Sequence, residues 1–108
     1  MNFVDLYSLM LHHVVAEKMR LWETEVLQTA RENLNRWLKS ASFAGSERNA
    51  LLEWQKILEN KTPEEIRKII MADTDEGQRL RSSSPFAGVL SETEREKIWS
   101  ECAEIRPV

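Results

Sequence analysis

The sequence contains few residues that interrupt helices, with three glycines and three prolines among 108 residues. A β-sandwich or barrel needs a turn every few residues, and glycine and proline supply many of those turns. Their scarcity therefore favours long helices and argues against a many-stranded fold. A chain of this length builds one modest core. We expect a single all-α domain that spans residues 1–108.

Cysteine is almost absent as well, since Cys102 is the only one. A lone cysteine excludes an internal disulfide, which agrees with a reducing compartment. No apolar run is long enough to cross a bilayer, because Asp5, Ser8 and two histidines interrupt the apolar N-terminal stretch. That stretch also lacks the basic start and small-residue cleavage site of a secretory signal. These features predict a cytoplasmic protein of bacterial type with no membrane association.

An excess of basic charge is missing too. The chain carries 15 basic and 18 acidic side chains, for a net charge of −3, and no basic block stands out. Binding to nucleic-acid phosphates usually requires a basic patch or stripe. Nucleic acid therefore stays open as a partner but is not favoured.

No catalytic or metal-binding constellation stands out. His13 and Glu17 share a helix face at i, i+4, but two ligands are too few for a metal site, and the only other histidine is His12. We interpret the two histidines as a surface or interface pair. Cys102 lies far in sequence from either possible base and is interpreted as a structural thiol. We expect no enzymatic activity, no metal and no cofactor.

Apolar residues at helical spacing are abundant, and they predict about five or six helices in a compact bundle. The first helix covers residues 3–22. A second follows after Glu23–Thr24, although the two could also run on as one kinked helix. A loop at Ser40–Arg48 then leads to a third helix, for which Ser46 is the candidate N-cap.

Two capping boxes mark further helix starts. Thr62 pairs with Glu65, and Ser91 pairs with Glu94, at N-cap and N3 spacing. A short helical turn lies between these two starts and is capped within residues 73–74. The buried face predicted for the last helix consists of Ile98, Cys102 and Ile105.

The apolar stripe of residues 3–22 is unusually wide, because Val4 and Leu9 add to it. A wide stripe predicts burial on more than one side, either within the fold or against a second chain. The N-terminal helix is therefore a candidate surface for self-association, and a dimer is possible. The four tryptophans are also many for this length. Core packing is their expected role, but one in an exposed patch would serve as an interface anchor.

The segment “RLRSSSPFAGVLSETER”, residues 79–95, joins two predicted helices. One interpretation is a connection that Phe86 pins to the core, with Arg79 and Arg81 solvated or ion-paired. The other is a phosphate or carboxylate site. Its cations would be the two arginines, and its other donors would be the hydroxyls of residues 82–84 and the helix N-terminus at Ser91.

The blocks “LLEWQKIL” and “GQRLRSSSPFAGVLSETER” resemble a group of small bacterial α-helical proteins. These share an RLR-x-SSPFAG-V/I-L-x-x-x-ER block downstream of a helix that contains tryptophan. The resemblance covers residues 50–97 and implies an antitoxin-like partner of nucleotidyltransferase-type toxins, with no catalytic residues assigned. The matching positions are Trp54, Arg79, Leu80, Arg81, Ser83, Ser84, Pro85, Phe86, Ala87, Gly88, Leu90, Glu94 and Arg95.

The sequence thus predicts a small non-enzymatic module, antitoxin-like or regulatory, that binds a partner protein. The alternative is a DNA-binding transcriptional regulator with a helix-turn-helix-like element around residues 63–82, whose Gln78, Arg79 and Arg81 would reach bases. The candidate partner-binding residues are Arg79, Arg81, Ser83, Ser84, Phe86 and Arg95.

Overall fold

The computed structural model describes residues 2–105, which form six helices and no strand. The prediction of an all-α bundle of five or six helices is confirmed. The helices are α1 (Phe3–Leu21), α2 (Glu23–Lys39), α3 (Gly45–Asn60), α4 (Pro63–Met71), α5 (Asp75–Arg81) and α6 (Glu92–Ile105).

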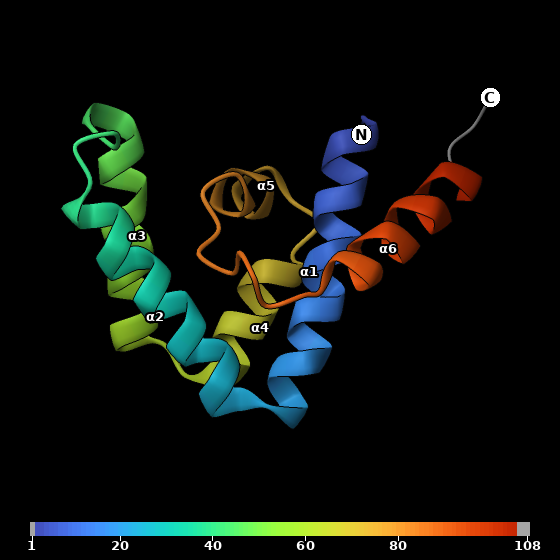
Figure 1. Ribbon diagram of the computed structural model, residues 1–108, viewed down its shortest axis with the longest axis horizontal. Helices are drawn as coiled ribbons and strands as arrows, with labels where there is room; N and C mark the ends of the chain where they lie inside the picture. The colour runs from blue at the N-terminus through green and yellow to red at the C-terminus, as the bar shows by residue number, and fades with distance from the viewer. Residues whose placement is uncertain (1, 106–108) are drawn as a thin grey trace.

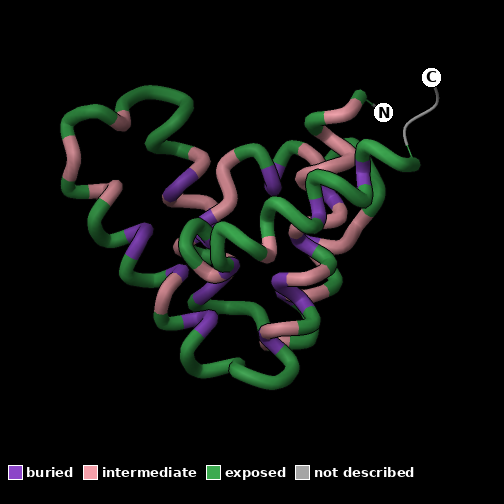
Figure 2. Tube along the Cα trace, turned by 45° about the vertical axis from the view of Figure 1, so that its right-hand side comes forward, coloured by how far each residue is buried: buried purple, intermediate pink, exposed green. Residues whose placement is uncertain are grey.

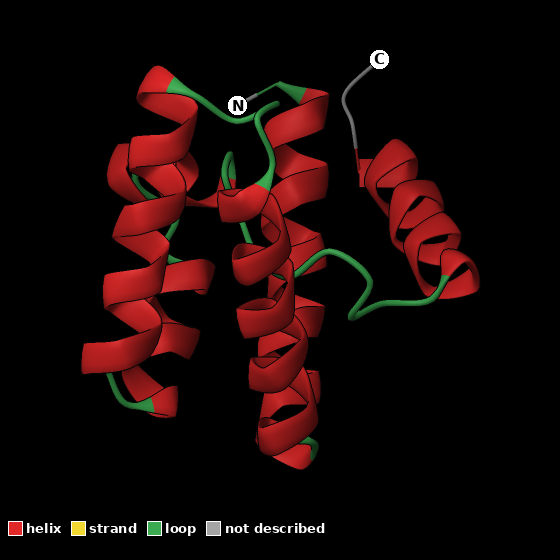
Figure 3. Ribbon diagram, turned by 60° about the vertical axis from the view of Figure 1, so that its left-hand side comes forward, coloured by secondary structure: helices red, strands yellow, loops and turns green. Residues whose placement is uncertain are grey.

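The longest helix, α1, is the centre of the arrangement, since it packs against α2, α4, α5 and α6. In Figure 1, α1 and α2 diverge from their shared corner like the arms of a V. Helix α3 packs against α2, and α4 and α5 lie between the arms. Helix α6 packs chiefly against α1 and stands at the edge of the molecule, as Figure 3 shows.

The helix boundaries follow local hydrogen bonds. Trp22 separates α1 from α2 with φ −132°, so the two do not form one continuous helix. Helix α3 begins at Gly45 after Ala44, with no side-chain cap, so the predicted N-cap at Ser46 is wrong. Gly45 has φ +60°, a backbone conformation that favours glycine. Thr74 caps α5 by accepting a hydrogen bond from the N–H of Gly77 at 3.0 Å.

Both predicted capping boxes are present. Thr62 Oγ1 accepts from the N–H of Glu65 at 3.1 Å, and the Glu65 carboxylate accepts from the N–H of Thr62 at 3.1 Å. Ser91 and Glu94 exchange the same two bonds, at 2.9 and 3.1 Å. These bonds satisfy N–H groups that a helix start otherwise leaves unpaired.

The core lies where the arms of the V meet α4 and α5, and Figure 2 shows the buried segments on the sides of the helices that face one another. Trp54 is fully buried, and its indole N–H donates to Leu80 O at 2.9 Å. By contrast, Trp22 and Trp99 are 57% and 49% exposed. Ile105 is 59% exposed, which corrects the prediction that it is buried, because the end of α6 extends beyond the core.

The wide stripe of α1 is explained mainly by burial within this chain. Helices α2, α4, α5 and α6 cover it from several sides. Val4 and Leu21, near the two ends of α1, are its exposed large aliphatic residues. No helix among residues 2–105 is both long and apolar enough to cross a membrane. The buried residues of α1 are Leu9, His12, Val15, Ala16 and Met19.

Candidate functional site

The segment between α5 and α6 is held from two sides by side chains of the first two helices. Asn33 of α2 donates through Nδ2 to Pro85 O at 2.9 Å and to Ala87 O at 2.8 Å. Lys18 of α1 donates to Val89 O at 2.9 Å. These bonds satisfy carbonyl groups that a loop cannot pair within itself.

Phe86 is 3% exposed and closes this segment onto the core. Its ring meets Trp54 edge-on at a centroid distance of 5.8 Å, and it meets His12 edge-on at 6.4 Å. The structure thus shows the connection pinned by Phe86 that one interpretation of the sequence expected.

His12 is 4% exposed, which corrects its interpretation as a surface residue, whereas His13 is exposed. Burial lowers the pKa of His12 from 6.5 to about 4, so the ring is neutral at pH 7. Its Nδ1 lies 2.7 Å from Ser8 O and therefore carries the ring proton. Nε2 then accepts from the Ser84 hydroxyl at 2.7 Å. The Ser84 hydroxyl also accepts from the N–H of Phe86 at 3.3 Å, so this pair fastens the loop to α1.

Arg79 is exposed and held by two carboxylates. It binds Glu53 with two parallel bonds of 2.9 and 2.8 Å and also bonds to Glu76. The hydrogen bonds that Arg79 donates to Glu53 and then to Glu76 raise the pKa of Arg79, and the same bonds lower the pKa of both glutamates. The Arg79 guanidinium thus joins α5 to α3 across the surface.

Arg81 is 4% exposed and points inward instead. Its Nη1 donates to Ala72 O at 2.6 Å, and burial lowers the pKa of the guanidinium. Its Nε and Nη2 atoms are buried with no partner in the described chain. Gly77 makes room for this contact: a Cβ there would lie 2.2 Å from Ala72 O and 3.0 Å from Arg81 Nη1.

The anion site considered from the sequence is not assembled. Arg79 is engaged by glutamates, Arg81 is buried against carbonyls, and the N–H of Ser91 donates to Glu94. Of the six candidate partner-binding residues, Arg79 and Arg95 are exposed, and Ser83 and Ser84 are half-buried. Arg81, like Phe86, lies in the interior.

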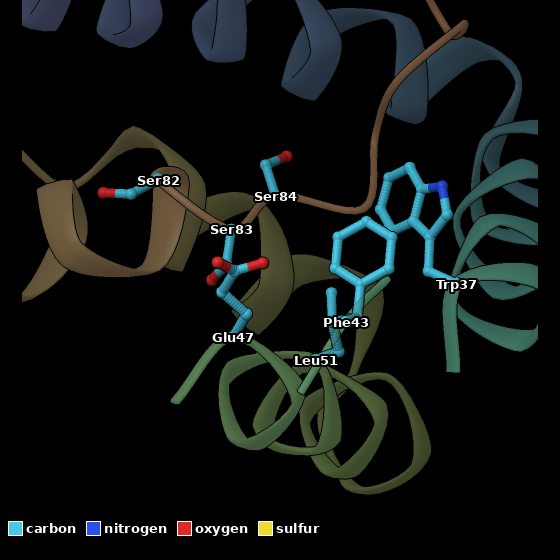
Figure 4. Close-up of a pocket in the computed structure, with 7 residues that line it drawn as sticks. All are labelled: Trp37, Phe43, Glu47, Leu51, Ser82, Ser83 and Ser84. Carbon is cyan, nitrogen blue, oxygen red and sulfur yellow. The ribbon is translucent and has the colours of Figure 1, made fainter. Parts of the chain in front are cut away.

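A groove lies beside the serine run, and we call it the serine groove. Its volume is about 310 Å³, within the range of small binding pockets. Figure 4 shows an apolar wall of aromatic and aliphatic side chains from α2, the following loop and α3, facing the serines after α5. The rings of Trp37 and Phe43 lie 6.0 Å apart at 33°. The lining residues are Trp37, Phe43, Glu47, Leu51, Ser82, Ser83 and Ser84.

Sequence reasoning found the serines but missed Phe43 and Glu47, and it assigned Trp37 to the core. The available signal was Phe43, an aromatic residue inside the predicted loop Ser40–Arg48. An aromatic residue in a loop needs an apolar surface, and half-buried Trp37 supplies it here.

A second surface lies between α1 and α6. Trp99 meets Phe3 edge-on at 4.5 Å and Tyr7 edge-on at 5.0 Å, and we call these three rings the Trp99 cluster. Beside it is a depression of about 470 Å³. That depression is lined by Tyr7, Glu92, Arg95, Glu96, Trp99 and Ser100.

Residues 2–105 contain no group of three or more histidine, cysteine, aspartate or glutamate side chains placed to hold a metal ion. No protein-family model matches the chain, and its comparison with curated proteins and with solved structures gave no significant match.

Proposed function

We propose that this protein is a non-enzymatic interaction module of the cytoplasm, antitoxin-like or regulatory, which binds a partner protein. The observation that carries the proposal is the Trp99 cluster, in which Trp99 stays 49% exposed after the fold is complete. Tryptophan, tyrosine and arginine dominate the energetics of protein interfaces. Trp99, Tyr7 and Arg95 line one depression here.

The cluster is prepared for binding because its rings already hold one another. Edge-on contacts with Phe3 and Tyr7 restrict the indole of Trp99 before any partner arrives. A restricted side chain loses less conformational entropy on association. Glu92 and Glu96 flank Arg95 around the depression and provide the polar rim that such interfaces usually have.

The DNA-binding alternative has weaker support in the geometry. Of the three side chains expected to reach bases, Arg81 is buried and Gln78 is half-buried. Arg79 is exposed but engaged by Glu53 and Glu76. A gel shift with the promoter of its own gene over a range of salt concentrations tests this alternative, because phosphate-driven binding weakens steeply with salt.

The test of the proposed function is affinity capture from the native host with tagged wild type, Trp99→Ala and Trp22→Ala. Protein is identified by mass spectrometry, and nucleic acid is assayed in the same eluate. Trp22→Ala is the matched control, since Trp22 is also exposed but lies at the α1–α2 corner. One stoichiometric protein that is retained by wild type and Trp22→Ala and lost by Trp99→Ala is expected.

Arg95→Glu supplies a second variant that spares the aromatic packing, and it should also lose the partner. Circular dichroism confirms that each variant is folded. Capture of no protein by the wild type, or loss of the protein only in Trp22→Ala, contradicts the proposal. Recovery of DNA without protein would favour the regulator instead.

A further inference from the structure

We infer that the serine groove receives a lysine or arginine side chain of the partner protein, with its cationic head at Glu47 and its aliphatic stem along Trp37 and Phe43. The inference rests on the proposed function, because the side chain belongs to the partner. It adds a chemical preference for that partner, namely a basic residue displayed on its surface.

The serine run offers the groove few free hydrogen-bond donors. The N–H groups of Ser82, Ser83 and Ser84 donate to carbonyls at the end of α5, at 3.1, 3.2 and 3.2 Å. The hydroxyls of Ser82 and Ser83 donate to Gln78 O and Leu80 O, at 2.8 and 3.4 Å. A hydroxyl that has donated its proton retains only lone pairs for a ligand.

The hydroxyl proton of Ser84 is also already used. Its hydroxyl donates to His12 Nε2 and is directed toward α1, away from the groove (Figure 4). An incoming carboxylate or phosphate would therefore meet few free hydrogen-bond donors along the serine side. A cation brings its own donors and can bond to the hydroxyl oxygen of Ser83, which lines the groove.

Glu47 provides the charge that such a cation needs. Its side chain lines the groove together with Ser83. Within residues 2–105, no hydrogen bond or ion pair engages this carboxylate. The neighbouring cation, Arg48, is directed to Leu38 O at 2.6 Å instead.

The opposite wall suits the stem of a basic side chain. Lysine and arginine carry several methylene groups that pack on apolar surfaces while the charged end stays polar. Trp37, Phe43 and Leu51 form such a surface, and the aromatic faces also attract a cation. A purely apolar side chain would match this wall but would form no ion pair with Glu47.

The test uses the full chain and small probes rather than the partner. Amide and indole resonances are followed by NMR during titration with Nα-acetyl-lysine N-methylamide. Nα-acetyl-norleucine N-methylamide keeps most of the stem without the ammonium group, and butyrate tests for an anion site. The lysine probe should perturb the Trp37 indole and the amides of Glu47 and Ser83, and the other two probes should not.

Glu47→Gln keeps the size of the side chain and removes its charge, so it should weaken binding of the lysine probe by about fivefold or more. Glu59→Gln, at the exposed far end of α3, is the matched control and should leave binding unchanged. Equal responses to lysine and norleucine, a response to butyrate, no response to lysine, or unchanged binding in Glu47→Gln would each overturn the inference. Lysine binding at Glu47 without any captured protein would overturn the proposed function alone.

Discussion

The Nε2 atom of His12 and the hydroxyl oxygen of Ser84 lie 2.7 Å apart, although 72 residues separate them in the chain. This bond joins α1 to the segment between α5 and α6 and requires a neutral imidazole. Burial meets that requirement by lowering the pKa of His12 to about 4. The connection between these helices is therefore sensitive to acid.

The stability of the protein should fall as the pH drops from 7 to 5. In this window the unfolded chain protonates His12, whose ordinary pKa is 6.5, and the folded chain does not. The contribution of His12 to the free energy of unfolding is complete above pH 6.5. It is lost progressively as the pH falls toward 4. The expected loss between pH 7 and pH 5 is roughly 2 kcal/mol.

Urea denaturation at a series of pH values measures this slope. His12→Gln should be less stable at pH 7 but should have a flatter profile between pH 5 and 7. His13→Gln removes the exposed neighbour and should keep the wild-type slope. A wild-type slope retained in His12→Gln would show that another group causes the acid sensitivity.

A second acid effect is expected at lower pH from Glu94. The N–H of Ser91, and then Lys18 at 2.9 Å, lower the pKa of this carboxyl to about 2. A lowered carboxyl pKa stabilises the fold above the ordinary value of 4.5, and this stabilisation is lost as the pH falls toward 2. The start of α6 should therefore loosen only after His12 has titrated.

Carbon-detected NMR titration of the Glu94 carboxyl tests this assignment. Lys18→Ala should raise the pKa of Glu94 but leave it below 4.5, because the Ser91 N–H bond remains. Arg20→Ala removes a nearby exposed cation that pairs with Glu17, and it should not change the titration. A Glu94 pKa that does not respond to loss of Lys18 would contradict the role given to the ion pair.

Gly77→Ala should destabilise the protein, although helix propensity alone predicts the opposite. Alanine in a helix interior is favoured over glycine by about 1 kcal/mol. Here the new Cβ would lie 2.2 Å from the backbone oxygen of Ala72, so α5 would have to move. A net loss of about 1–3 kcal/mol is expected.

Thermal and urea denaturation determine the sign of this change. Asn49→Ala is the control, because Asn49 is exposed in α3 and its substitution should give the small gain that propensity predicts. A stabilised Gly77→Ala protein would mean that α5 does not pack as closely on Ala72 as the structure shows.

Features that depend on neighbours in sequence could be predicted, and features that depend on distant contacts could not. The capping box of Thr62 and Glu65 is readable because both partners lie within one helical turn. The burial of His12 was missed because its partner Ser84 comes from another part of the fold. Ile105 continues the apolar stripe of α6, but it is exposed because the end of the helix extends beyond the core.

The sequence drew attention to the serine run and Arg79, but it could not show which donors were already used. The hydroxyls of Ser82 and Ser83 donate to carbonyls of α5, so these hydroxyl protons are not free to bind an anion. The apolar wall opposite the serines could not be predicted, because it forms only when the turn after α2 brings the ring of Phe43 against Trp37.

Asn33 of α2 holds the loop between α5 and α6 from the side opposite to α1. Its amide donates to two carbonyls, Pro85 O and Ala87 O, and the residue is 5% exposed. Asn33→Ala leaves both carbonyls without this donor, at an expected cost of about 1–3 kcal/mol of unfolding free energy. Asn35→Ala, two positions along α2 and exposed, should be nearly neutral.

Urea denaturation measures the loss of unfolding free energy in Asn33→Ala, and hydrogen exchange shows which residues become less protected. In Asn33→Ala, exchange should accelerate at the amide of Val89, which bonds to Phe86 O, more than in the middle of α1. If the whole chain loosens equally, the loop is part of the cooperative core. If neither stability nor exchange changes, Asn33 does not hold the loop, and the serine groove must keep its shape through Phe86 and the His12–Ser84 bond alone.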